Sequence, residues 1–434
     1  SGDGTGLTGV AGTENIRTNT NATFLKNINV GVAITAGKLG IGFTDTNVKV
    51  GNTALDSLTT GVNNTAVGRN ALTANTSAND VTAIGHNSLA ANTSGEGNIA
   101  VGSYSLDANT TGSNNIAIGY LALSASTTAS HNTAVGYLGL EDNSTGQYNS
   151  SFGSSALIQN TTGSSNSSFG YGSLNSNTTA SNNTAIGALA LNQNTTGDKN
   201  TAVGTEALDA NTTADRNTAI GYQSLSANTT GERNTAIGTY SLILNTTGVD
   251  NVAFGDAALY NNSTASYNTA VGRSAMSQNT TGASNTALGY NALNSNTTAS
   301  NNTAIGKEAL TVNTTGAENT AVGASALDAN TTASGGAAFG LGALGANTTG
   351  AENTSLGTSS MQQNTTGAYN VAVGNQALKA NTTASNNTSI GYKSLFSNTT
   401  GTQNVAVGAY ALNENSTADF NNAVGYYALQ ANTT

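Results

Sequence analysis

The sequence predicts an all-β fold, a parallel β-solenoid of about 23 rungs with 17 residues in each rung. One phrase, seen in the form NTAIGALALNQNTTGDK at residues 183–199, recurs from residue 47 to residue 434 without any insertion or deletion. Each copy carries a Gly at the same place, from Gly51 and Gly68 to Gly425. A unit with two or three apolar residues cannot bury a core alone, but it can when it stacks on copies of itself.

The first 46 residues precede the repeat and differ from it. The segment INVGVAITAGKLGIG, residues 28–42, alternates like one or two strands with a turn at Gly37. We expect residues 1–46 to form a cap or collar region with short strands that starts the stack. Residues 47–434 are expected to form the solenoid shaft.

The 17 positions of the repeat are called columns, with column 1 at the Asn of NTAIG. Column 5 is Gly in all 23 copies, column 4 is always Val, Ile, Leu or Phe, and columns 1 and 12 are Asn in 21 copies each. Column 8 is always small, and column 3 is Ala or Ser except at Lys49. Columns 6, 7, 10, 11, 16 and 17 vary, and they hold all 15 Tyr. We therefore expect the variable columns to face solvent.

Columns 1–5 predict a short strand that ends at its Gly. Column 2 accepts Ile and Val in place of Thr, so columns 2 and 4 are predicted to share the inward face, with the small column 3 opposite. Column 9, which is Leu in 21 copies and Met in two, is predicted to complete the core. The predicted core is represented by Val67, Leu72, Ile84, Leu89, Ile186, Leu191, Met276 and Met361.

The NTTG or NTTA phrase of columns 12–15 predicts a turn, because Asn and Gly tolerate left-handed backbone. Asn side chains stacked ~4.8 Å apart can form amide ladders. The same phrase is an N-glycosylation sequon, but that spacing leaves no room for a glycan on every rung, which favours the ladder. The predicted ladder and turn residues are Asn75, Asn92, Asn183, Asn194, Gly68 and Gly187.

The constant repeat length predicts that several chains pack side by side, because a lone solenoid usually tolerates loops on one face. A lone solenoid with a thin core is the alternative. The small columns 3 and 8 would permit close approach between chains. In one stretch, acidic residues follow one another in column 16 and basic residues in column 17. These are candidate inter-chain charge files, with local neutralisation on a solvated face as the alternative: Asp198, Asp215, Glu232, Lys199, Arg216 and Arg233.

Composition argues against several classes of function. The net charge of −10 argues against nucleic-acid binding, and no run of ~18 apolar residues could insert in a membrane. There is no Cys, no periodic Asp, and no recurring set of catalytic residues around His86 or His131. We therefore expect a protein that is not an enzyme and has no cofactor or metal.

The repeat resembles known extracellular fibres. NTAIG and NTAVG, followed by a small residue and Leu, resemble the repeats of trimeric autotransporter adhesin heads, which implies a left-handed β-roll in a homotrimer. The longer phrase at residues 217–238, with GDGTGLTGV near the N-terminus, is similar to cyanophage-type tail-fibre proteins.

The resemblance implies the shaft of a phage tail fibre, a rigid spacer in the virion that supports attachment to a host-surface glycan or protein and joins other fibre or baseplate proteins. The alternative is a bacterial cell-surface adhesin or extracellular filament. Ice or glycan binding by the stacked Thr or Tyr side chains is a third hypothesis.

Overall fold

The computed structural model describes residues 46–433, and the regular elements in that range are three-residue β-strands spanning columns 2–4. Their bounds are β1 (Val48–Val50), β2 (Thr65–Val67), β3 (Thr82–Ile84), β4 (Ile99–Val101), β5 (Ile116–Ile118), β6 (Thr133–Val135), β7 (Ser150–Phe152), β8 (Ser167–Phe169), β9 (Thr184–Ile186), β10 (Thr201–Val203), β11 (Thr218–Ile220), β12 (Thr235–Ile237), β13 (Val252–Phe254), β14 (Thr269–Val271), β15 (Thr286–Leu288), β16 (Thr303–Ile305), β17 (Thr320–Val322), β18 (Ala337–Phe339), β19 (Thr354–Leu356), β20 (Val371–Val373), β21 (Thr388–Ile390), β22 (Val405–Val407) and β23 (Asn422–Val424).

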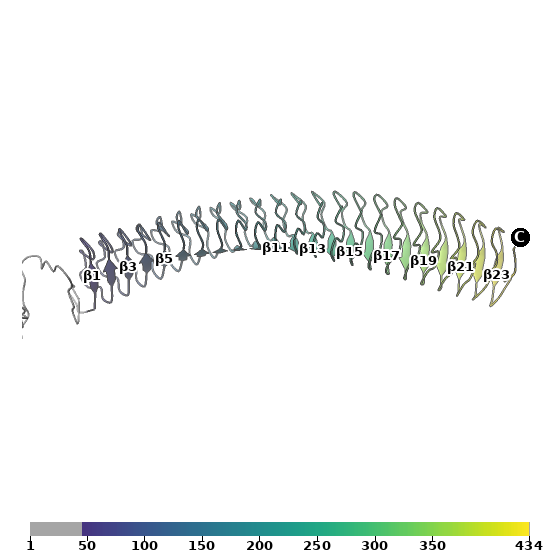
Figure 1. Ribbon diagram of the computed structural model, residues 1–434, viewed down its shortest axis with the longest axis horizontal. Helices are drawn as coiled ribbons and strands as arrows, with labels where there is room; N and C mark the ends of the chain where they lie inside the picture. Colours follow the sequence, from purple (N-terminus) through teal and green to yellow (C-terminus); the bar gives the residue numbers. More distant parts are fainter. Residues whose placement is uncertain (1–45, 434) are drawn as a thin grey trace, which may run out of the picture. The chain divides into compact units, whose positions relative to one another are not determined.

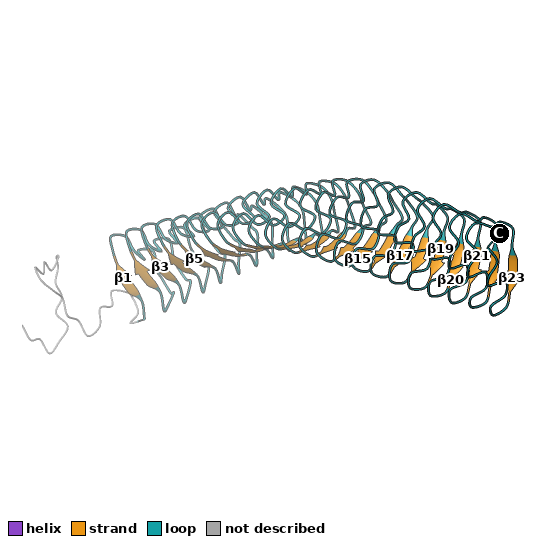
Figure 2. Cartoon of the chain, turned by 45° about the vertical axis from the view of Figure 1, so that its right-hand side comes forward, coloured by secondary structure: helices purple, strands orange, loops and turns teal. Residues whose placement is uncertain are grey.

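Each strand pairs in parallel with the next strand along the chain. Between β9 and β10, Thr184 is opposite Thr201, and the same 17-residue offset holds from β1–β2 to β22–β23. The rungs therefore stack in sequence order (Figure 1), and the strands form one continuous sheet along one side of the stack (Figure 2). The predicted parallel β-solenoid is confirmed.

The core is a thin layer between the strand and the segment that returns beneath it. Ala185 in column 3, Ala190 in column 8 and Leu191 in column 9 have no exposed surface. Met276 and Met361 occupy the Leu position of their rungs and are equally buried. The column 9 part of the predicted core is therefore confirmed: Leu72, Leu89, Leu191, Met276 and Met361.

The inward and outward faces of the strand are the reverse of the prediction. Ile84 and Ile186 are 39% and 43% exposed, and Val67 is only half-buried. Successive strand side chains alternate between faces, so a buried column 3 turns columns 2 and 4 outward. The return segment brings its Leu close to the sheet, and a close-packed layer of that thickness admits only Ala or Ser on the strand side.

The turns explain two of the most constant columns. Gly187 has φ +131°, and a Cβ at this residue would lie 2.6 Å from the carbonyl carbon of Gly204 in the next rung, so column 5 accepts only Gly. Leu191 has φ 52°, a left-handed conformation that costs ~1–2 kcal/mol. Complete burial of a Leu side chain contributes ~1.5–3 kcal/mol, which offsets that cost.

The predicted cap or collar at residues 1–46 lies, apart from its last residue, outside the described residues, and so do its predicted strands.

Candidate functional surfaces

The column 12 Asn side chains form the predicted amide ladder. Asn194 Nδ2 donates to Asn177 Oδ1 at 3.0 Å, and Asn211 Nδ2 donates to Asn194 Oδ1 at 2.8 Å. Asn92 Oδ1 likewise accepts from Asn109 Nδ2 at 2.7 Å. Asn75 instead closes its own turn, accepting from the Ala78 N–H at 3.0 Å. These side chains stabilise the turns and tie each rung to the next.

Column 1 forms a second ladder with different bonds. Asn183 Nδ2 donates across its own rung to the Gly197 carbonyl at 2.9 Å, and Asn183 Oδ1 accepts from the Asn200 N–H at 2.8 Å. The side chain therefore replaces backbone pairing at the point where the chain enters the strand. A buried amide with both groups bonded rigidifies the rung.

The Asn side chains of the sequons and the column 13 hydroxyl groups take part in hydrogen bonds between rungs. Asn194 has no exposed surface, so its amide cannot carry a glycan in the folded shaft. Thr195 Oγ1 donates to the Thr212 carbonyl of the next rung at 2.9 Å. Since the column 13 hydroxyl donates to backbone, its only donor is not available to an ordered water array.

The two charge files take on roles within one chain. Asp198 Oδ1 accepts from the Ser181 N–H at 2.7 Å, and Asp215 Oδ1 accepts from the Asp198 N–H at 2.7 Å. Ser commonly does the same in column 16, as Ser300 Oγ does for the Ala283 N–H. Where column 16 carries a side-chain oxygen of this kind, that oxygen satisfies a backbone N–H group of the preceding rung, although Val and Ala also occur in this column.

The basic file faces solvent. Arg233 pairs with Glu232 at 2.7 Å and with Asp250 at 2.8 Å, whereas Lys199 and Arg216 are exposed. The Arg233 guanidinium lowers the pKa of Asp250, mainly through a side-chain hydrogen bond. Exposed pairs of this kind contribute little to stability, because solvent screens them. The proposed contact between charge files of different chains stays a prediction.

The outer sheet face, defined as the side chains of columns 2 and 4, is an apolar surface along the shaft. Its column 4 members include Ile118 at 40%, Phe254 at 52% and Leu288 at 46% exposed. Column 2 adds Thr, Val and Ile beside them. A contiguous apolar surface of this length is uncommon on a monomer, which makes the outer sheet face a candidate surface for association.

Side-chain sizes on the outer sheet face are matched within rungs. Column 4 is Phe in four rungs, and three of these have Ser or Ala in column 2, namely Ser150, Ser167 and Ala337. No other repeat has Ser or Ala in column 2. A large residue thus accompanies a small one at the same level, as expected for side chains that share a fixed volume.

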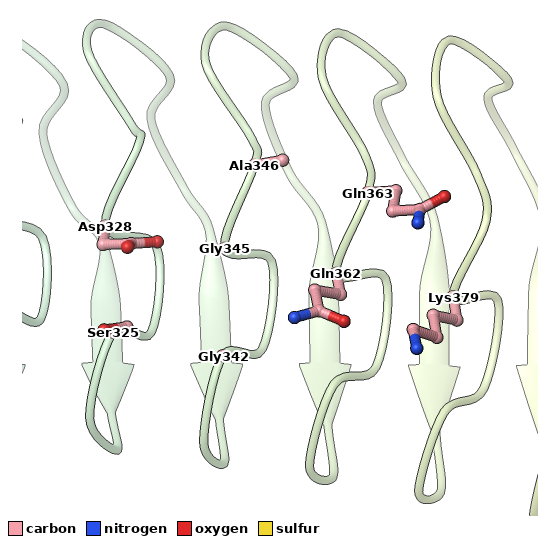
Figure 3. A pocket seen from close by; sticks show the side chains of 8 residues that line it. All are labelled: Ser325, Asp328, Gly342, Gly345, Ala346, Gln362, Gln363 and Lys379. Carbon is pink, nitrogen blue, oxygen red and sulfur yellow. The ribbon is translucent and has the colours of Figure 1, made fainter.

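A shallow notch lies on the return segments near the C-terminal end of the shaft (Figure 3). Its volume is about 430 Å³, and it opens where Gly342 and Gly345 replace the side chains of columns 7 and 10. Asp328 lies on one side of the notch, and Gln362 and Lys379 lie on the other. Polar side chains and missing Cβ atoms make this a candidate binding site.

Column 10 also holds partly buried carboxyl groups. Burial raises the pKa of Asp209 to about 6, and repulsion from Glu206 adds to the increase. Burial likewise raises the pKa values of Asp107 and Asp328. Asp209 Oδ1 has no hydrogen-bond partner. Column 10 of the rung before holds Asn192, whose Nδ2 donates to the Gly172 carbonyl at 2.8 Å, a bond that a carboxylate cannot make.

The His residues make contacts with their neighbours. His86 Nε2 lies 2.7 Å from Arg69 Nη2, and the His131 ring stacks on Tyr148 at 5.1 Å. Within residues 46–433, no group of three His, Cys, Asp or Glu residues is arranged to hold a metal ion. The same range contains no helix of the length and hydropathy needed to cross a membrane.

Neither a protein-family model nor a curated protein sequence matches this chain.

Proposed function

We propose that this chain is the structural shaft of a homotrimeric phage tail fibre, and that the number of stacked rungs sets the length of the shaft. The repeat spans ~110 Å at ~4.8 Å per rung. In this proposal the shaft holds an attachment tip away from the virion and has no catalytic role. Its support is the resemblance of the repeat to fibre proteins together with the geometry of the outer sheet face.

The observation that carries the proposal is the size match on the outer sheet face. If three chains run parallel and in register, each level contains three copies of one rung, so its column 2 and column 4 volumes must fit together. Phe169 beside Ser167 meets that requirement. A staggered or antiparallel arrangement would pair different rungs, so contact between chains would not require a size match within one rung.

The energetics favour association of long shafts. Burying the exposed remainder of one column 4 side chain contributes roughly 0.5–1 kcal/mol. Over 23 rungs this gives about 12–23 kcal/mol per chain, compared with an association cost of ~4–15 kcal/mol. A few rungs would not associate, whereas the full shaft would.

The absence of Cys from the chain permits a direct test with single Cys substitutions. Val101→Cys in β4 and Val373→Cys in β20 are each expected to form inter-chain disulfides on mild oxidation, because equivalent residues meet only in a parallel, in-register assembly. Gln193→Cys in column 11 is the matched control and is expected to stay reduced. Cross-linking only when both Cys substitutions are present would indicate antiparallel chains.

Light scattering on the full chain tests the number of copies. We expect three times the chain mass of 43.0 kDa. A mass of one chain would refute the fibre assembly. Phage structural genes beside the coding region would support the viral assignment, and a secretion anchor would favour the adhesin alternative.

A further inference from the structure

Two lysines and three aromatic rings form a cluster next to the notch. The lysine–aromatic patch consists of Lys379, Tyr392, Lys393, Phe396 and Tyr410. Lys393 Nζ lies 5.3 Å from the centre of the Phe396 ring and 5.4 Å from that of Tyr392. Lys379 Nζ, from the preceding rung, lies 5.9 Å from the same Phe396 ring. The Tyr392 and Tyr410 rings are in edge-to-face contact at 5.3 Å.

The patch is cationic in an acidic protein. The chain has 12 basic and 22 acidic residues, yet among the described residues neither Lys379 nor Lys393 has a carboxylate within ion-pair distance. Lys307, by contrast, lies 3.5 Å from Glu308. Two unpaired ammonium groups around one ring produce a local positive potential that favours an anionic ligand.

The notch extends this surface with hydrogen-bonding groups. Lys379 lines both the patch and the notch, Gln362 lies between Lys379 and the open rung of Gly345, and Gln363 also lines the notch (Figure 3). A volume of about 430 Å³ falls within the range of small-ligand sites. The aromatic rings, the two Lys ammonium groups and the Gln amides therefore lie on neighbouring rungs along the shaft axis.

We propose that the patch and the notch together bind one strand of an acidic polysaccharide lying along the shaft. The C–H faces of its sugars stack on Phe396 and Tyr392, and its carboxylate or sulfate groups pair with Lys379 and Lys393. Its hydroxyls bond to the Gln362 and Gln363 amides. The Asp328 carboxyl group lines the far side of the notch, where the proposed site ends.

This inference is independent of the fibre assembly. The patch and the notch lie in columns 6, 7, 10 and 11 of the return segment, whereas the proposed contact between chains uses columns 2 and 4. Polysaccharide binding is therefore expected whether the chain is a monomer or a trimer. Failure of either proposal leaves the other standing.

The test measures binding of the full chain to polygalacturonate, to heparin and to neutral dextran. Binding to at least one acidic polymer is expected to exceed binding to dextran and to weaken with added salt, because the interaction is electrostatic. Comparison of the two acidic polymers distinguishes carboxylate from sulfate recognition. Equal binding to dextran and to both acidic polymers would overturn the proposal.

Substitutions locate the site. Lys379→Gln and Lys393→Gln are each expected to weaken binding roughly threefold to fivefold, the effect of losing one exposed ion pair. Phe396→Asn, which introduces a common column 10 residue, is expected to weaken binding up to about tenfold. Lys307→Gln removes the same charge elsewhere on the shaft and should leave affinity unchanged. An equal loss in Lys307→Gln would show non-specific attraction and overturn the site.

Gly345→Gln tests the notch separately. Column 10 already accepts Gln at Gln362, and the nearest atom to a Cβ at Gly345 is the flexible Asp328 Oδ1 at 3.2 Å, so the rung is expected to fold. The new side chain fills the notch and should weaken polysaccharide binding severalfold. Wild-type affinity in this variant would overturn the notch as part of the site.

Discussion

At the residue scale, Ser126 is where the column 12 amide ladder is interrupted. Asn109 Oδ1 and Ser126 Oγ are both buried and have no hydrogen-bond partner. Ser126→Asn supplies an amide that donates to Asn109 Oδ1, and we expect it to raise the free energy of unfolding by ~1 kcal/mol. Guanidinium unfolding followed by Tyr fluorescence measures the change. Ser126→Ala is the control without an amide, and a loss of stability in Ser126→Asn would contradict this account.

Asp209 predicts a dependence of stability on pH. Its folded pKa of about 6 lies above the ordinary value of 3.8, so the folded chain binds the proton first. Stability should therefore rise as pH falls from 7 toward 4, and this contribution disappears as pH rises through about 6.

Asp209→Asn removes that contribution and introduces an amide that can bond to the Leu189 carbonyl, as Asn192 does to Gly172 in the preceding rung. We expect a gain of no more than ~1 kcal/mol at pH 7, because the group is partly solvated. Unfolding midpoints of both proteins at pH 4, 5, 6 and 7 should converge at the acid end. A constant difference across this range would exclude Asp209 as the titrating group.

Much of the residue pattern could be predicted from the sequence because it follows from local chemistry. Gly187 and Asn194 stand in columns with almost no variation, and the structure shows a steric reason for the first and a ladder for the second. The direction of Ile186 could not be predicted, since a three-residue strand with Ala between Thr and Ile permits either face to be buried. The thickness of the core decides which face of the strand is buried, and that thickness depends on where the return segment places Leu191.

At the scale of the single element, the turn after each strand depends on its Gly. Gly187→Ala places a Cβ in a backbone region reserved for Gly and against Gly204, so the turn must shift and take its neighbours with it. We expect a loss of at least ~2 kcal/mol in the free energy of unfolding. Ala188→Ser, one residue later in a variable column, is the matched control. Equal stability of both variants would show that column 5 is Gly for another reason.

The candidate surfaces follow from contacts between elements, which explains why the sequence indicated them incompletely. The variable columns predicted that the Tyr side chains face solvent, but they did not indicate that Lys379 and Lys393 lie around one aromatic ring. Those residues stand 14 apart in the sequence and meet because column 10 of one rung adjoins columns 7 and 10 of the next. The notch could not be predicted from the repeat either, since Gly345 leaves a space only where the neighbouring rungs carry larger side chains.

At the scale of the whole molecule, the repeat length sets the register of every rung at once. Deleting residues 183–199 removes one complete rung and leaves each remaining strand opposite its equivalent, as Phe169 would be with Val203. Deleting residues 183–198 removes one residue fewer, so column 3 of every later rung would have to shift or a turn would have to absorb Lys199.

Stability of a stacked array is roughly the sum of its rungs and their interfaces, so loss of one complete rung is expected to change the unfolding midpoint little and to shorten the rod by ~4.8 Å. The 16-residue deletion is expected to lower the midpoint clearly, because a one-residue slip exchanges the buried and exposed faces of a strand. Thermal unfolding by circular dichroism and rod length by small-angle scattering measure both effects. If the two deletions changed the unfolding midpoint equally, register between rungs would not explain the constant repeat length. The proposed in-register association of chains would then lose its structural basis.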